Sequence, residues 1–97
     1  MPDPSVPLPP DEQIEQALLA IAQRRGWGAS ACPSEVARQL RPKGWRDLMP
    51  SIRRVAAGLA QRGELDITQR GLPVAPTEPF KGPIRVRLKP PHPQNEV

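Results

Sequence analysis

The sequence has almost none of the side chains that usually build metal sites and covalent catalytic sites. Its 97 residues include one cysteine, Cys32, one histidine, His92, and no tyrosine. One cysteine cannot form an internal disulfide, and the four cysteine or histidine ligands of an ordinary zinc site cannot be assembled from one of each. No histidine lies near Cys32 in the sequence to activate it as a nucleophile. We therefore expect no metal ion and no thiol chemistry.

Long apolar runs and catalytic motifs are absent too. The longest apolar run covers residues 17–22, far short of the roughly 20 residues that cross a bilayer, and residues 1–10 have no signal-peptide pattern. No glycine-rich phosphate loop, nucleophile motif or pair of catalytic carboxylates occurs. Helix caps and solvent-exposed faces account for four carboxylates, Glu35, Asp47, Glu64 and Asp66. These absences predict a cytoplasmic protein with no membrane partner, no cofactor and no enzymatic activity.

Proline, by contrast, is abundant and concentrated near the two ends. Eight of the 15 prolines lie there, at Pro2, Pro4, Pro7, Pro9, Pro10, Pro90, Pro91 and Pro93. Segments of this composition favour extended chain over a packed core. We therefore expect disordered tails over residues 1–10 and 90–97, and one folded domain over residues 11–89. A domain of this size has room for a single modest core.

Charge is divided unevenly along the chain. Residues 1–23 hold four acidic and no basic side chains, a charge of −4, whereas residues 24–97 hold all fourteen basic and six acidic ones, a charge of +8. The net charge is +4. A basic surface attracts polyanions, of which nucleic acid is the commonest. The alternative is that the arginines only keep a small protein in solution.

The first predicted helix covers residues 11–25. Its apolar residues recur three and four positions apart, which gives one buried stripe on a helix. Gly26 can adopt the left-handed conformation that closes such a helix. The stripe consists of Ile14, Ala17, Leu18, Ile21 and Ala22.

Two further helices are predicted before residue 63. The second, shorter helix begins after Cys32, because Glu35 can accept a hydrogen bond from the backbone N–H of the cap residue. The third covers residues 47–62, with Asp47 as its cap and Pro50 in the first turn, where a missing N–H is tolerated. Its buried stripe consists of Leu48, Ile52, Val55, Ala56 and Leu59.

After Gly63 the apolar residues alternate, which predicts two antiparallel strands with one buried face. Residues 69–83, between these strands, contain several prolines and glycines and predict a long irregular loop. A short extra strand at residues 30–31 would fit between the first two helices. The predicted fold class is therefore mainly α with a small antiparallel hairpin (α+β), a winged helix-turn-helix of three helices followed by a two-stranded wing. The buried strand positions are Leu65, Ile67, Ile84, Val86 and Leu88.

Four short motifs, in order along residues 12–88, resemble one bacterial family. They are Cys32-Pro33-Ser34-Glu35-Val36-Ala37-Arg38, Trp45-Arg46-Asp47-Leu48-Met49-Pro50, Ile67-Thr68-Gln69-Arg70-Gly71 and Lys81-Gly82-Pro83-Ile84-Arg85. The chain is similar to the bacterial domain of unknown function family 3253. This resemblance implies a small winged-helix-like bacterial protein. It supplies no catalytic residues.

The candidate nucleic-acid surface combines the outward face of the third helix with the wing. That outward face consists of Pro50, Arg54, Ala57, Gly58 and Gln61, so it favours contact with a phosphate backbone over reading of base edges. Arginines on the wing could instead serve only to keep an exposed strand edge from aggregating. The residues predicted to contact nucleic acid are Arg38, Lys43, Arg46, Arg53, Arg54, Gln61, Arg70, Lys81, Arg85 and Arg87.

Three aromatic residues leave two interpretations open. Trp27 and Trp45 could stack on bases, but tryptophans just after helix ends more often seal a small core. Phe80 is expected to tuck onto the core, with an exposed anchor as the alternative.

The expected partner is double-stranded DNA. The alternative is a protein-interaction module that uses the surface of Ala57 and Gly58, Phe80 and the long loop. For either function the sequence leaves open whether the protein is a monomer or a two-fold dimer.

Overall fold

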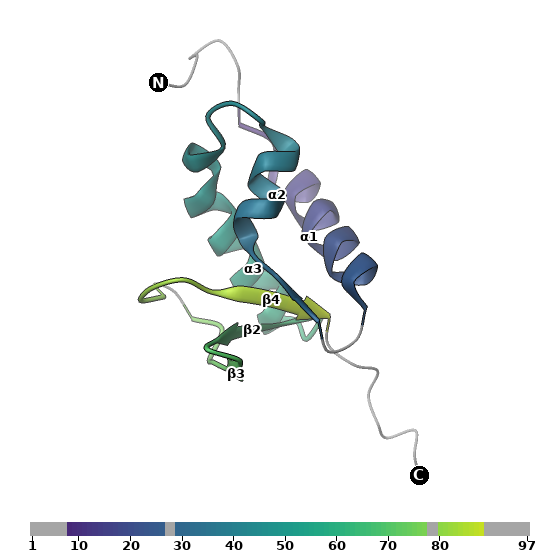
Figure 1. The fold of residues 1–97 in the computed structure, drawn as a ribbon, viewed down its shortest axis with the longest axis vertical. Coiled ribbons are helices and arrows are strands. Elements are labelled where there is room, and N and C mark those ends of the chain that lie inside the picture. Colours follow the sequence, from purple (N-terminus) through teal and green to yellow (C-terminus); the bar gives the residue numbers. More distant parts are fainter. Residues whose placement is uncertain (1–7, 27–28, 78–79, 89–97) are drawn as a thin grey trace.

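The computed structural model of the protein describes residues 8–26, 29–77 and 80–88. Trp27 lies outside the described residues, and so do residues 1–7 and 89–97, which make up most of the two predicted tails. The described part is an α+β fold in which three helices pack on a small antiparallel sheet of four strands (Figure 1).

Helix α1 spans Asp11–Arg25, as the apolar stripe predicts. Asp11 lies in its first turn and Arg25 in its last, so each charge opposes the partial charge at that end of the helix. Gly26 ends the helix with a φ of 84°, and its N–H donates to the carbonyl oxygen of Ala22 at 3.1 Å.

Helix α2 spans Pro33–Leu40, and its first turn has the predicted cap. The N–H of Cys32 donates to Oε2 of Glu35 at 3.1 Å. The carboxylate of Glu35 also pairs with Arg25 at the end of α1. One glutamate therefore both caps α2 and joins its start to the preceding helix.

The third helical region begins in a different way from the prediction. A 3₁₀ turn, η1, covers Trp45–Leu48, and helix α3 covers Met49–Gln61. Asp47 lies inside the turn and does not cap α3, whose cap residue is Leu48, so the predicted cap is wrong. The cause is Gly44, which reverses the chain at a φ of 80° and accepts a hydrogen bond from the N–H of Asp47 at 3.1 Å.

The sheet has the order β1-β4-β2-β3, with every neighbouring pair antiparallel. Strand β1 covers Ser30–Ala31, β2 covers Leu65–Gln69, β3 covers Leu72–Pro73 and β4 covers Arg85–Leu88. The pairing of β2 with β4 and the short strand β1 are confirmed. A hairpin of only two strands is wrong, because the sheet of the described residues has four.

Strand β3 was missed because the turn before it gives an unusual signal. Arg70 and Gly71 both have positive φ, 54° and 81°, as a tight two-residue hairpin requires. Asparagine or glycine is the usual residue at the first of these positions, and arginine is not. The sequence therefore predicts an irregular loop where β2 in fact reverses directly into β3.

A single core lies between the helices and the sheet. All the predicted stripe residues of the third helix are buried there, and Val86 of β4 is fully buried between β1 and β2. Figure 1 shows the three helices on one side of the sheet, with α1 and α3 flanking α2. Of the residues between β3 and β4, the described ranges 74–77 and 80–84 lie beside α3.

Candidate nucleic-acid interface

The outward face of α3 is covered at Ala57, while Pro50, Arg54 and Gln61 remain exposed. Successive helical residues lie about 100° apart around the axis, which places Ala57 almost opposite the buried stripe of Ile52, Val55 and Leu59. Ala57 is nevertheless only 3 % exposed. The prediction that Ala57 offers an open surface to a partner is therefore wrong.

The segment that follows β3 covers this face, and we call residues 74–77 and 80–83 the strap. Arg53 donates from Nη2 to the carbonyl oxygens of Phe80 and Gly82, at 3.1 and 2.8 Å. Two helical turns further on, Gln61 donates from Nε2 to the carbonyl oxygen of Pro76 at 2.7 Å. Ala57 lies one turn from each contact, so the strap passes over it.

The composition of the strap explains why it needs these donors. Proline has no backbone N–H, so a proline-rich segment has more hydrogen-bond acceptors than donors. Gln69 supplies further donors from β2, because its Nε2 donates to the carbonyl oxygens of Lys81 and Pro83, at 2.7 and 3.4 Å. Gln69 was not among the predicted site residues. The excess of prolines beside Arg53, Gln61 and Gln69 is the signal that could have indicated these contacts.

The acidic first helix neutralises a second side of α3. Arg54 makes two hydrogen bonds to the carboxylate of Asp11, at 2.6 and 2.9 Å. Arg62 bonds to Glu15 at 3.2 Å and to Glu64 at 2.9 Å. The hydrogen bond from Arg54 lowers the pKa of Asp11, and the bonds to Glu15 and then Glu64 raise the pKa of Arg62. Two of the four acidic residues in the first part of the sequence, Asp11 and Glu15, therefore pair within the molecule.

The pair of Arg54 and Asp11 predicts an acid-dependent loss of stability. Because the folded state lowers the pKa of Asp11 below 3.8, its contribution is present above that pH and is lost as the pH falls through the folded pKa. Asp11→Asn should therefore lower the melting temperature slightly at pH 7 and have a smaller effect at pH 2. Thermal melts of both proteins at low salt would measure this. An equal difference at both pH values would contradict it.

The two predicted strand arginines are also engaged within the sheet. Arg85 of β4 donates from Nε to Oγ of Ser30 at 2.6 Å and from Nη2 to its carbonyl oxygen at 3.0 Å. Arg87 pairs with Asp66 of β2 at 3.6 Å. Both side chains tie β4 to its neighbours, so their guanidinium groups are less available to a ligand.

Five of the ten predicted residues have exposed side chains whose charged groups make no hydrogen bond or ion pair within the described residues. They fall into two groups, one at the end of α2 and in η1, and the other at the β2–β3 turn and in the strap. The five are Arg38, Lys43, Arg46, Arg70 and Lys81.

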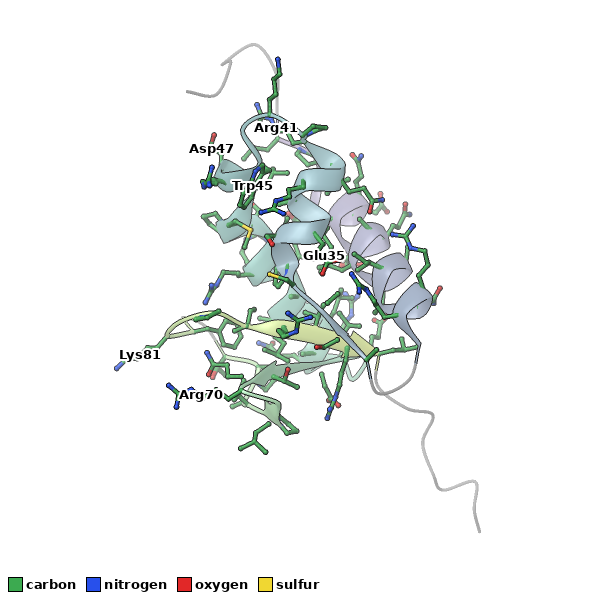
Figure 2. The ribbon with its side chains drawn as sticks, in the orientation of Figure 1. Glu35, Arg41, Trp45, Asp47, Arg70 and Lys81 are labelled. Carbon is green, nitrogen blue, oxygen red and sulfur yellow. The ribbon has the colours of Figure 1, made fainter. Side chains whose placement is uncertain are left out.

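The first group surrounds one tryptophan. The guanidinium carbons of Arg38 and Arg46 lie 4.7 and 4.6 Å from the centre of the Trp45 ring. Trp45 is partly buried and packs against the core, so its predicted sealing role is confirmed. We call Arg38, Trp45 and Arg46 the Trp45 cluster. Lys43 lies in the connection between its parts, and Figure 2 shows Trp45 between α2 and η1, with Arg41 and Asp47 at the same end of the molecule.

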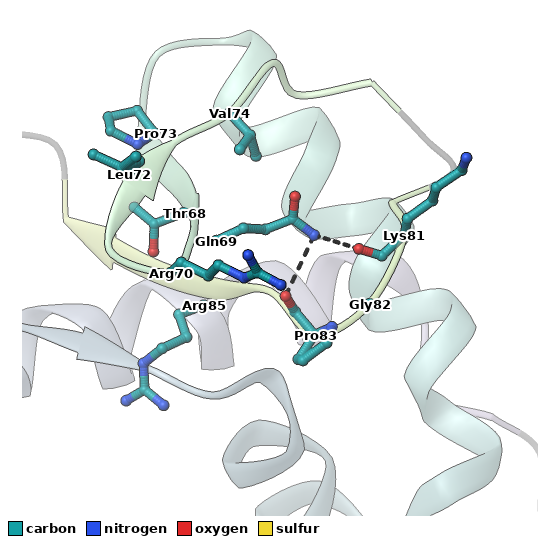
Figure 3. A pocket seen from close by; sticks show the side chains of 10 residues that line it. All are labelled: Thr68, Gln69, Arg70, Leu72, Pro73, Val74, Lys81, Gly82, Pro83 and Arg85. Carbon is teal, nitrogen blue, oxygen red and sulfur yellow. Dashed lines mark hydrogen bonds between the residues drawn. The ribbon is translucent and has the colours of Figure 1, made fainter.

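The second group lies at a pocket between the β2–β3 turn and the strap. Leu72, Pro73, Val74 and Pro83 give this pocket apolar walls, and Arg70 and Lys81 line it as well. Figure 3 shows the Gln69 side chain bridging to the strap across the pocket, while Arg85 points away from it. In Figure 2, Arg70 and Lys81 extend to the same side of the molecule.

Phe80 is tucked onto the core, as predicted. It is partly buried and packs against the core, and Arg53 lies over its ring at 5.9 Å. Of the surface predicted for a protein partner, Ala57 is buried, whereas Gly58 and Phe80 are only partly buried.

No helix in residues 8–26, 29–77 and 80–88 is both long and apolar enough to span a membrane. The same residues contain no group of three or more cysteine, histidine or carboxylate side chains that could hold a metal ion.

A family model matches the part of the chain that contains α3 with its strap, the four-stranded sheet and the two groups of exposed cations. Residues 11–89 match the family described as protein of unknown function, DUF3253. The chain belongs to this family. The match confirms the resemblance that the four sequence motifs indicate. No curated protein matches the DUF3253 chain closely enough to count as a relative.

Proposed function

We propose that this domain binds nucleic acid through the phosphate backbone, as a non-enzymatic module. The observation that carries the proposal is the contrast between its cations. Carboxylates or backbone oxygens engage Arg53, Arg54, Arg85 and Arg87, while Arg38, Lys43, Arg46, Arg70 and Lys81 keep exposed positive charge. Exposed arginine and lysine groups without internal counter-ions are what phosphate contacts require.

The scaffold that we propose is a variant of the winged helix-turn-helix. The element order supports it, because three helices are followed by antiparallel strands and a short strand lies between the first two helices. In this interpretation, β2, β3, the strap and β4 together form the wing. The variation is that the wing folds back over α3 instead of extending away from it.

The partial cover on α3 favours binding without strong sequence preference. The helix that would enter the major groove and read base edges has the strap on its outward face and α1 beside it. Gln61, the residue with the best chemistry for adenine, uses its amide to hold Pro76. Double-stranded DNA of any sequence is therefore the expected partner, and its phosphates are the expected contacts.

A salt titration tests this function. We expect a labelled 16-base-pair duplex to bind at low salt, with the logarithm of the affinity falling by about 0.9 per phosphate contacted for each unit of log salt concentration. Five contacts would give a slope of about −4.5. A second duplex of unrelated sequence should bind with an affinity within a few-fold of the first. Absence of binding to both duplexes at low salt would refute the proposal.

One observation favours a protein partner as the second candidate. Leu72 at the sheet edge is 69 % exposed and lies beside the pocket between the β2–β3 turn and the strap. A partner strand or loop could bury this side chain. Recovery of one protein from a nuclease-treated lysate by the wild type, but not by Leu72→Ser, would support this function, provided that neither duplex binds.

A cytoplasmic location stays a prediction.

A further inference from the structure

The Trp45 cluster differs from the other arginine contacts in the described part of the chain. Elsewhere, guanidinium groups donate hydrogen bonds to carboxylates, carbonyl oxygens, an amide or a hydroxyl group. Arg38 and Arg46 instead rest on an aromatic ring. The guanidinium groups that donate in this way are those of Arg24, Arg25, Arg53, Arg54, Arg62 and Arg85, while that of Arg87 forms an ion pair with Asp66.

Stacking on a ring leaves the hydrogen-bonding capacity of an arginine unused. A cation–π contact uses the positive charge of the guanidinium group and none of its five N–H donors. Those donors match the two oxygens of a phosphodiester, which arginine can bind through two parallel hydrogen bonds. Each stacked arginine is therefore oriented and still free to donate.

The two guanidinium groups are also held close together without a counter-ion. Since their carbons lie 4.7 and 4.6 Å from one ring centre, they are at most 9.3 Å apart. Residues 38–47 contain four basic side chains and one acidic one, Asp47, which makes no ion pair among the described residues. Arg41 adds to the positive charge of this segment, and its Nη1 atom is buried without a hydrogen-bond partner among the described residues. An anion bound here would relieve this repulsion.

Trp45 supplies the rigidity. Its ring packs against the core, and it joins an arginine of α2 to an arginine of η1. Long arginine side chains normally lose conformational freedom when they bind a ligand. Here contact with the ring already restricts both arginine side chains in the free protein, so ligand binding costs less conformational entropy.

We propose that the Trp45 cluster is a preformed clamp for the phosphodiester backbone of nucleic acid, with Arg38 and Arg46 as the contacting groups and Trp45 as the positioning residue. The clamp rests on the proposed function and makes it more specific. It places the main contact at the turn between α2 and α3, away from the covered face of α3.

The first test removes two charges at the clamp and compares the same change elsewhere. Arg38→Gln with Arg46→Gln should weaken binding of the 16-base-pair duplex at least tenfold at about 0.1 M salt and reduce the salt slope by about two. The control is Arg24→Gln with Arg85→Gln, a double variant with the same net charge as the first. In the wild type, Arg24 and Arg85 contact the neutral residues Gln39 and Ser30. The control should lose less than about threefold in affinity, because only the long-range attraction changes.

The second test keeps every charge and removes only the ring. Trp45→Leu should weaken binding about fivefold, and Trp45→Phe should restore much of that loss, because phenylalanine still supports a cation–π contact. Melting curves of both variants verify that the domain remains folded. Equal affinity of the leucine variant and the wild type would show that Trp45 does not position the arginines.

The outcomes separate the clamp from the function on which it rests. If the wild type does not bind the duplex at low salt, the proposed function fails and the clamp fails with it. If the wild type binds but both double variants weaken binding equally, net charge alone drives binding. The clamp is then refuted, while the proposed function stands.

Discussion

Replacing Ala57 with glutamate is expected to destabilise the domain by about 3 kcal/mol, because the new carboxylate must either be buried beneath the strap or force the strap away from α3. Ala57 is 3 % exposed and lies between the strap contacts of Arg53 and Gln61. Urea unfolding followed by circular dichroism would measure the loss. If the helix face were open, as the sequence alone predicts, the change would be within about 0.5 kcal/mol.

The neighbouring Gly58 provides the matched control. A Cβ atom added at Gly58 would have no heavy atom within 4 Å, and its φ is helical. Gly58→Ala should therefore stabilise the domain by about 0.5–1 kcal/mol, because alanine loses less conformational entropy in a helix. Opposite signs at adjacent positions would locate the edge of the strap. Destabilisation by both substitutions would instead indicate that the strap covers more of α3.

Shortening Leu59 to alanine should cost about 2–5 kcal/mol, the largest effect that we predict for a single substitution. Leu59 is 0 % exposed and lies on the opposite side of α3 from Ala57, within the core formed with α1 and β2. Removing three buried carbon atoms leaves a cavity that the surrounding helices can fill only in part. The same urea experiment applies. A loss below about 1 kcal/mol would mean that this core is loosely packed.

Much of the fold could be predicted from local sequence patterns. The stripe from Ile14 to Ala22, the cap between Cys32 and Glu35 and the alternation around Ile67 and Val86 each specify one element, because a helix or a strand repeats over short distances. The start of α3 could not be predicted in the same way. Asp47 could either cap α3 or lie within a 3₁₀ turn, and Gly44 favours the 3₁₀ turn by reversing the chain before it.

The candidate site was harder to predict, because its decisive contacts join distant residues. Charge and helical spacing predicted Arg53, Arg54 and Gln61 as outward-facing groups. Each of them instead finds a partner 15 to 43 residues away, in the strap or in α1. No short-range pattern encodes such partners. Composition did predict a basic surface, and the five exposed cations are the members of the predicted set whose charged groups find no internal partner among the described residues.

The strand order has a consequence for biosynthesis. Strand β4 is last among the described strands, yet it lies between β1 and β2, and the contact of Arg85 with Ser30 spans 55 residues. Neither β1 nor β2 has its main partner until Leu88 has left the ribosome. Until then α1 lacks β4, one of the elements against which it packs, so the core is incomplete. Folding of this domain should therefore be a late, cooperative step that follows release of β4, slower than its helical content suggests.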